Sequence, residues 1–388
     1  MITPDNMWRP ENVSWTVSHT RELVPSAAVR RGEQVSLLPR ELVDLDDLPI
    51  DDGGVTVPLK EALRRSHVDG FIVVRRGKVV FERYLGMQPE TSHILQSVSK
   101  SMVAALTGVV VGEGLIRPAD LVTDHLPELV GSCWDGCTIE HLLDMRAGVA
   151  SDESDYEDET SEAYRGFRIL GWLSRLEDDP LPADYIAAMS SQGPHGGPFE
   201  YRSILTDVLG WCLERATGES LASLFSSRIW QPMGAGHDAD LLLGPGGFPL
   251  ADGGLCVTLS DLARFGLMFL HGGAIDGRQV VPGEWVQRLR FADADRIEAF
   301  RSSPDSRDMP PTAFYRDQWW VRDAEAGIYS GYGIHGQQVL VHHPSECVVA
   351  RMSSWPRPWD DDAARLGDAA AFAVCAALSS SSALSEPV

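Results

Sequence analysis

Ser97 and Lys100 stand three residues apart in an S-x-x-K stretch of this chain. Residues at positions i and i+3 of a helix share a face, so the hydroxyl and the amine can touch. A serine becomes a nucleophile when a base takes its proton. A lysine in an apolar pocket can act as that base, because desolvation lowers its pKa from about 10.4 toward neutrality. The spacing alone is also typical of a helix N-terminus with a surface lysine.

The scarcity of lysine gives this pair weight. Arginine does not give up its proton in proteins, whereas a desolvated lysine does. The chain holds 33 basic residues, of which three are lysines: Lys60, Lys78 and Lys100. One of the three follows Ser97 at helical spacing and precedes an apolar stretch, which favours a catalytic interpretation.

Tyr201 is a third candidate, at a turn between the Gly/Pro-rich tract 192–198 and a predicted helix over 206–217. A neighbouring lysine cation favours the phenolate, which could take the Ser97 proton and return it to a leaving group. The glycine-rich stretch 330–336 lets a backbone come close, and its N–H groups could join that of Ser97 in an oxyanion hole. An ordinary packed aromatic and a bulged edge strand are the alternatives.

The surrounding pattern predicts an α+β fold. Apolar and aromatic runs over 71–84 indicate a hairpin, and the small apolar run 97–111 indicates a buried helix. Strand-like runs return at 318–321, 338–342 and 347–352, before a last helix over 363–378. We expect one antiparallel sheet flanked by helices, with a mainly helical domain inserted into it.

The expected domain boundaries follow from this order. Residues 1–60 are polar, with a loop over 44–54, and are predicted to form an N-terminal extension packed on the surface of the α/β domain. Residues 61–130 and 250–388 form the discontinuous α/β domain. Residues 131–249 form the mainly helical domain and carry loops of the site.

Composition excludes several function classes. The net charge of −23 disfavours nucleic acid and anionic membranes as partners, and fits solubility. We see neither a signal peptide nor a membrane span, so we expect a cytoplasmic protein. The six cysteines are scattered and predict no metal site. We expect no cofactor, a small-molecule substrate and, as one assembly to consider, a homodimer.

The three motifs, in this order, resemble those of serine hydrolases related to class C β-lactamases and DD-peptidases. Within that group the chain is most similar to the 6-aminohexanoate-dimer hydrolases, which are nylon-oligomer amidases, and to related carboxylesterases. The similar stretches are 23–29, 96–101, 318–320, 333–337 and 353–356. The resemblance implies the penicillin-recognising fold and an acyl-enzyme mechanism.

The resemblance also implies roles for particular residues. Ser97 would be the nucleophile, and Lys100 and Tyr201 would share the role of base. The N–H groups of Ser97 and Ile334 would bind the oxyanion. The substrate-binding residues would be Tyr156, Asp252, Trp320, Gly333 and His335.

Two departures from the wider pattern bear on substrate. Ser203 stands where the Y-x-N motif has asparagine, and Gly331-Tyr332-Gly333 stands where the K-T-G motif has lysine. Those polar groups help hold a lactam and its carboxylate, so esters or linear amides become the expected substrates and β-lactam hydrolysis becomes unlikely. An acyltransferase of secondary metabolism and a catalytically dead binding protein remain as alternatives. The acidic stretch 152–162 is either a solvated loop or a recognition element for a cationic group.

Overall fold

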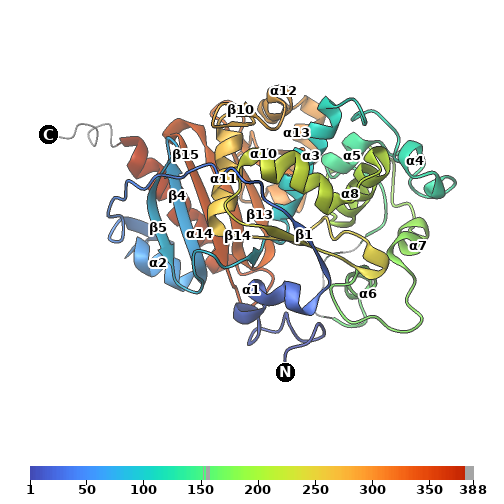
Figure 1. Ribbon diagram of the computed structural model, residues 1–388, viewed down its shortest axis with the longest axis horizontal. Helices are drawn as coiled ribbons and strands as arrows, with labels where there is room; N and C mark the ends of the chain where they lie inside the picture. The colour runs from blue at the N-terminus through green and yellow to red at the C-terminus, as the bar shows by residue number, and fades with distance from the viewer. Residues whose placement is uncertain (152, 154–157, 381–388) are drawn as a thin grey trace.

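The computed structural model describes residues 1–151, 153 and 158–380 and is built around a seven-stranded antiparallel sheet (Figure 1). The strand order is β11-β12-β13-β14-β15-β4-β5. The predicted hairpin and C-terminal strands are confirmed. The strands are β4 (Val68–Arg75), β5 (Lys78–Tyr84), β11 (Phe314–Arg316), β12 (Trp319–Asp323), β13 (Ile328–Gly333), β14 (Gln337–His342) and β15 (Cys347–Ser353).

Helices cover both faces of this sheet. Helices α2 (Leu59–Arg65) and α14 (Asp361–Ser380) pack on one face, and α11 (Leu259–Leu270) packs on the other. Strand β15 shows the consequence, because Val349 belongs to the core under α14 while the adjacent Val348 belongs to the core under α11. A strand buried on both faces is an almost continuous apolar run rather than an alternating one.

A second sheet corrects the prediction of a single one. It has four strands in the order β1-β7-β8-β6. These are β1 (Ser26–Val29), β6 (His93–Ile94), β7 (Ala239–Leu242) and β8 (Leu255–Val257). Strand β6 ends three residues before Ser97, and β8 follows Asp252 closely, so this small sheet brings both residues to one end of α3 (Val98–Gly112).

The N-terminal segment is more ordered than the sequence indicated. It supplies β1 to the second sheet, the helix α1 (Val13–Leu23) and a hairpin of β2 (Pro49–Asp52) and β3 (Val55–Pro58). The prediction of a loop over 44–54 is therefore wrong for the part that forms β2. Its strand partner is β3, and the two form an antiparallel hairpin whose four residue pairs run from Pro49 with Pro58 to Asp52 with Val55.

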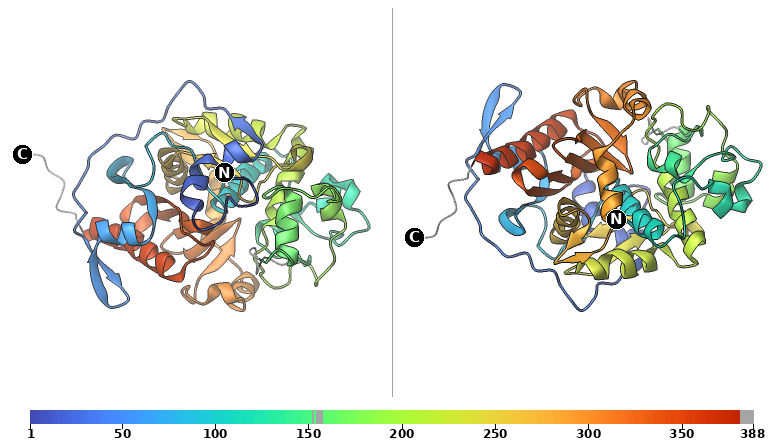
Figure 2. Two further views of the ribbon diagram at one scale, coloured as in Figure 1. Left: turned by 90° about the horizontal axis from the view of Figure 1, so that it is seen from below. Right: turned by 90° about the horizontal axis from the view of Figure 1, so that it is seen from above.

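The remaining helices gather away from the large sheet, as the two views of Figure 2 show. They include α4 (Val122–His125), α5 (Ile139–Leu143), α6 (Glu162–Leu170), α7 (Pro182–Ala187) and α8 (Ile204–Thr217). Smaller elements complete the chain: α9 (Leu221–Leu224), α10 (Gln231–Met233), β9 (Ala274–Ile275), β10 (Arg278–Gln279), α12 (Gly283–Gln287) and α13 (Ala294–Arg301). Among the described residues, no helix has the length and apolar character needed to cross a membrane.

Helix α3 lies between these helices and the sheet, and it is buried along almost its whole length. Each residue from Val98 to Gly108 is buried, and the helix contacts both β13 and α8. Its N-terminus is therefore the place where the two parts of the molecule meet, and Ser97 stands there as the N-cap residue.

Candidate active site

The predicted Ser97–Lys100 pair meets at the N-terminus of α3. The Lys100 Nζ donates a hydrogen bond of 2.7 Å to Ser97 Oγ and another of 2.8 Å to the backbone oxygen of Asp252. Lys100 is 1% exposed, whereas Ser97 is half-buried and so accessible from one side. Gln96, directly before the serine, holds a left-handed backbone with φ of 48°. A strained residue beside a nucleophile is a common feature of sites whose geometry the surrounding fold enforces.

Tyr201 lies on the other side of the same pair. The Lys100 Nζ is 5.2 Å from the centroid of the Tyr201 ring. Burial raises the pKa of Tyr201, while the charge of Lys100 and a hydrogen bond with Ser97 oppose that rise. Trp320 stacks on the phenol ring, with centroids 5.5 Å apart, and so fixes its orientation. The structure thus brings Ser97, Lys100 and Tyr201 together.

The protonation of Lys100 differs from the sequence-based prediction. Burial does act to lower the pKa of this amine, as expected. The acidic groups of Tyr201, Asp252, Glu153 and Asp207 outweigh that effect, and the pKa of Lys100 is raised above its usual value. The expected fall toward neutrality is wrong because the apolar helix predicted the desolvation but not the acidic neighbours. Lys100 is an ammonium group at neutral pH.

Strand β13 passes close to the serine. A Cβ atom on Gly333 would lie 2.6 Å from the Leu95 oxygen and 3.0 Å from the Ser97 nitrogen, so only glycine allows this approach. Ile334 follows directly and begins a short 3-10 turn. Among the turn, loop and cap hydrogen bonds of the described residues, neither the Ser97 N–H nor the Ile334 N–H donates to a backbone oxygen.

His335 is the middle residue of that turn, and its side chain is buried. It is 1% exposed and has a left-handed backbone with φ of 58°. Its ring Nδ1 is 2.8 Å from the Trp355 oxygen, and the ring of Trp8 stacks on it at 5.3 Å. Burial lowers the pKa of His335 to about 4, so the ring is neutral and suited to packing. The side chain holds the turn that carries Ile334.

The other predicted substrate-binding residues fall in different places. Trp320 is half-buried against Tyr201. Asp252 is only 7% exposed, and its backbone N–H donates to Asp207 Oδ1 at 3.0 Å. Tyr156 lies outside the described residues, as do Asp155 and Glu157 of the acidic stretch.

Two acidic residues of the site, Asp207 and Glu153, were not predicted from the sequence. Asp207 is fully buried in α8, and a carboxylate within the mainly apolar first ten residues of that helix was the available signal. Glu153 accepts hydrogen bonds from the backbone N–H and the hydroxyl of Ser203, the latter at 2.9 Å. Nothing local distinguished it from the other acids of its stretch. Among the described residues, no group of three or more acids, histidines or cysteines could hold a metal ion.

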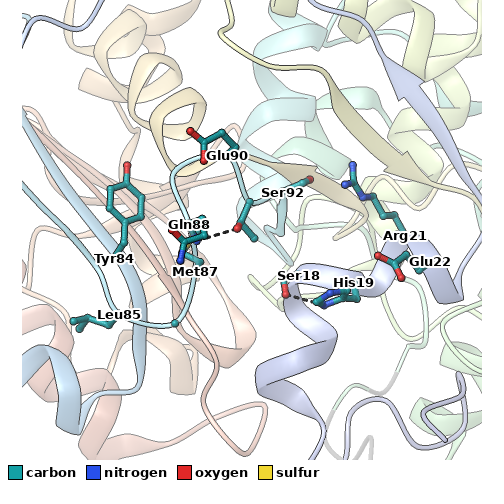
Figure 3. Close-up of a pocket in the computed structure, with 12 residues that line it drawn as sticks. Ser18, His19, Arg21, Glu22, Tyr84, Leu85, Met87, Gln88, Glu90 and Ser92 are labelled. Atoms are coloured by element: carbon teal, nitrogen blue, oxygen red, sulfur yellow. Dashed lines mark hydrogen bonds between the residues drawn. The ribbon is translucent and has the colours of Figure 1, made fainter.

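A separate surface pocket of about 590 Å³ lies between α1 and the segment that follows β5 (Figure 3). Its lining includes His19, Arg21, Tyr84 and Glu90, and none of the predicted site residues. The dashed contact between Ser18 and His19 joins neighbours on one helix. The same His19 Nδ1 lies 2.8 Å from the Trp15 oxygen, and both side chains are partly exposed, so this pair is a local contact on α1 rather than a buried nucleophile with its base.

Comparison with known proteins agrees with this geometry. The family model described as Beta-lactamase matches residues 61–373. The chain is 36% identical to 6-aminohexanoate-dimer hydrolase of Paenarthrobacter ureafaciens, over 92% of this chain and 89% of that protein. It is 31% identical to Esterase EstB of Burkholderia gladioli, over 70% of this chain and 76% of that one.

The fold has solved counterparts as well. A Bacillus anthracis protein assigned as a 6-aminohexanoate-dimer hydrolase superposes with a TM-score of 0.88 at 24% identity, covering 97% of each chain. The predicted resemblance and the predicted fold class are confirmed. The chain belongs to the beta-lactamase family of serine hydrolases.

Proposed function

We propose that this protein cleaves esters or linear amides through an acyl-enzyme on Ser97. The observation that carries the proposal is the 2.7 Å hydrogen bond between Lys100 Nζ and Ser97 Oγ at the N-terminus of a buried helix. A helix N-terminus favours a developing negative charge, and a buried amine beside a hydroxyl is the arrangement that activates a weak nucleophile.

Lys100 and Tyr201 act as one unit in the proposed mechanism. The pKa values of both groups are raised, so in the resting enzyme at neutral pH the amine is an ammonium and the phenol is neutral. The unit becomes competent when it loses one proton. Tyr201 then takes the Ser97 proton as the oxygen attacks the carbonyl, while Lys100 stabilises the negative charge on the two oxygens.

The proton then moves to the leaving group. The tetrahedral intermediate collapses, the leaving alcohol or amine takes the proton from Tyr201, and the acyl group stays on Ser97. Water repeats the sequence in place of the serine hydroxyl and releases the acid. The proposed donors to the carbonyl oxygen are the N–H of Ser97 and the N–H of Ile334, the residue after the Gly333 that comes close to the Ser97 nitrogen.

The two parts of the chain contribute different groups to this site. We propose that residues 61–130 and 250–388 form one domain, which supplies Ser97, Lys100 and Ile334. Residues 131–249 form the other and supply Tyr201. A small-molecule substrate would bind between them, next to Trp320. The cytoplasmic location and the homodimer stay predictions.

The substrate class follows from the relatives and from the third motif. One similar protein is a 6-aminohexanoate-dimer hydrolase and another is an esterase, which supports linear amides and esters. Their names are those of hydrolases, which favours water over the acyltransferase alternative. At the third motif Gly331 stands where a lactamase would present a lysine, and the hydroxyl of the adjacent Tyr332 donates to Asp368 at 2.9 Å. That exchange argues against a lactam carboxylate.

A substrate panel tests the proposal. Purified protein is assayed against p-nitrophenyl butyrate, linear 6-aminohexanoate dimer and a chromogenic cephalosporin, each beside Ser97→Ala. We expect turnover of the ester, the dimer or both, loss of that turnover in the variant, and no cephalosporin hydrolysis above the variant. Equal rates for the two proteins on every substrate would contradict the mechanism.

A further inference from the structure

A pair of buried aspartates lies directly beneath the catalytic lysine. Asp207 is fully buried on α8, and Asp252, in the loop before β8, is 7% exposed. The Asp252 N–H donates to Asp207 Oδ1 at 3.0 Å, and the Asp252 backbone oxygen accepts from Lys100 Nζ at 2.8 Å. A chain of two hydrogen bonds therefore connects α8 to the amine that contacts Ser97.

The carboxyl groups of these two aspartates lie beside each other. Asp207 Oδ2 and Asp252 Oδ1 are both buried, and neither has a hydrogen-bond partner among the described residues. An ionised carboxylate can only accept, so two carboxyl groups bond to each other only when one of them carries a proton. Two adjacent buried carboxyl groups therefore favour the state with one shared proton and one negative charge, because two negative charges would repel each other.

The charge of the pair faces Lys100. The titratable groups acting on the amine are Tyr201, Asp252, Glu153 and Asp207, which come from the turn before α8, the loop before β8, the acidic stretch and α8 itself. Burial raises the pKa of Asp252 to about 6 and that of Asp207 well above its usual range. Asp252 is thus the ionised member at neutral pH.

We propose that Asp207 and Asp252 act together as positioning residues for Lys100, holding the amine through the Asp252 backbone oxygen and supplying the buried negative charge that balances its ammonium group. The inference rests on the proposed Ser97–Lys100–Tyr201 centre and adds the element that sets its proton affinity. It also moves Asp252 from the predicted substrate-binding set to a place beneath the catalytic lysine.

The charge on the Asp207–Asp252 pair affects the pH dependence of the reaction. The Lys100–Tyr201 unit must lose one proton to become active, and a negative charge nearby makes that loss harder. The charge on the pair therefore places the rise of kcat/KM at higher pH than the lysine and tyrosine would give alone. Removing the charge should move the rise toward lower pH.

Two isosteric variants separate charge from shape. Asp252→Asn removes the ionised member and leaves Asp207 protonated, so the rise of kcat/KM with pH should shift down by about one pH unit. Asp207→Asn replaces the shared proton by an amide N–H that donates to Asp252. The Asp252 carboxylate keeps its negative charge, so the rise of kcat/KM with pH should not shift down. A merely structural role would not give different results for two such similar changes.

The matched control is Asp144→Asn, since Asp144 is also buried and burial raises its pKa to about 6, but it faces Arg296 and Asp317 rather than Lys100. The assay is p-nitrophenyl butyrate hydrolysis from pH 5 to 10, with thermal melting to confirm folding. The double variant Asp207→Asn/Asp252→Asn should show the same pH profile as Asp252→Asn. It replaces Asp252→Asn in the test if the single variant melts early.

The results distinguish a failure of the aspartate inference from a failure of the proposed Ser97 centre. A downward shift in Asp252→Asn and in the double variant, with Asp207→Asn and Asp144→Asn unshifted, supports the inference. An unshifted profile in Asp252→Asn, or an equal shift in Asp207→Asn or Asp144→Asn, overturns it while Ser97→Ala is inactive. Hydrolysis that survives in Ser97→Ala would instead overturn the proposed centre itself.

Discussion

The molecule contains two buried pairs of aspartates, Asp144 with Asp317 and Asp207 with Asp252. Arginines balance the negative charge of the first pair, and a lysine faces the second. Arg296 donates to Asp144 at 2.6 Å, and Arg288 donates to both oxygens of Asp317, at 2.7 and 3.0 Å. The cation that faces the other pair is Lys100. An arginine keeps its proton permanently and forms fixed, two-pronged pairs, whereas a lysine can exchange its proton.

The comparison separates a structural cluster from one that faces the proposed catalytic lysine. Asp144 and Asp317 tie the end of α5 to the segment before β12, through permanent charges that cannot take part in proton transfer. Asp207 and Asp252 face an amine that contacts a nucleophile candidate. In the proposed account, the same residue type, equally buried, serves stability in one place and sets proton affinity in the other.

The largest expected effect is on activity at Lys100. Lys100→Arg keeps a positive charge opposite the Asp207–Asp252 pair but replaces the compact ammonium, which contacts Ser97 Oγ and the Asp252 oxygen, by a larger planar guanidinium whose shape does not match those two contacts. We expect kcat/KM for p-nitrophenyl butyrate to fall about a thousandfold. Lys60→Arg is the matched control, because Lys60 is exposed and pairs with Asp47 at the surface. Activity of Lys100→Arg within a few fold of wild type would remove the distinction between the two clusters.

The next effect is on stability, at the arginine-rich cluster. Arg296→Ala leaves Asp144 buried without its cation, which typically costs about 3–5 kcal/mol of unfolding free energy. Activity per folded molecule should stay near that of wild type. Urea denaturation measures the loss, with Arg30→Ala as control, since that exposed pair with Asp238 should contribute about 0–1 kcal/mol. A similar small loss in both variants would show that the cluster is not structural.

The two pairs should look alike when stability is measured against pH. The pKa of Asp144 and that of Asp252 are about 6 in the fold, against about 3.9 in an unfolded chain. Between those values the folded protein holds protons that the unfolded chain has released, so the stability contributed by each group falls as pH rises from about 4 to 6.

Asn variants at the two positions should therefore lose less stability than wild type across that window. The measurement is the unfolding free energy at several pH values for Asp144→Asn, Asp252→Asn and wild type. Curves parallel to that of wild type would mean that neither carboxyl group is protonated by its burial. The two variants should therefore change the pH dependence of stability alike, whereas only Asp252→Asn should shift the pH dependence of kcat/KM.

The smallest effect concerns Glu153, which binds Ser203 and adds negative charge near Lys100 and Asp252. A carboxylate there should favour substrates that carry an amine. Glu153→Gln should raise the Michaelis constant for 6-aminohexanoate dimer about two- to fivefold and leave that for p-nitrophenyl butyrate unchanged. If the Michaelis constants of the two substrates change equally, Glu153 only supports the loop and does not select substrates.

The sequence predicted the parts of the molecule whose patterns are local. The β4–β5 hairpin, the buried helix α3 and the C-terminal strands have apolar runs that their own residues make visible. The pairing of β1 with β7 could not be found in this way, because Ser26 meets Leu242 across more than two hundred positions. Nothing near Trp8 indicates that its ring stacks on His335.

The site shows the same limit. Ser97 and Lys100 are three residues apart, and the spacing itself carried the information. Asp207 and Asp252 are separated by 45 positions, and the charge that they impose on the amine depends on that long-range contact. The predicted direction of the Lys100 pKa was wrong for this reason, since the helix alone contains the desolvation and not its compensation.

The central claim is that Ser97 carries the acyl group. Wild-type protein is mixed with excess p-nitrophenyl butyrate, quenched in acid within the first turnovers and examined by intact-protein mass spectrometry, followed by peptide mapping. The account predicts a butyryl adduct on the peptide that contains Ser97, and no adduct in Ser97→Ala. A butyryl adduct of equal yield in Ser97→Ala, or one mapped to another residue of the wild-type chain, would contradict it.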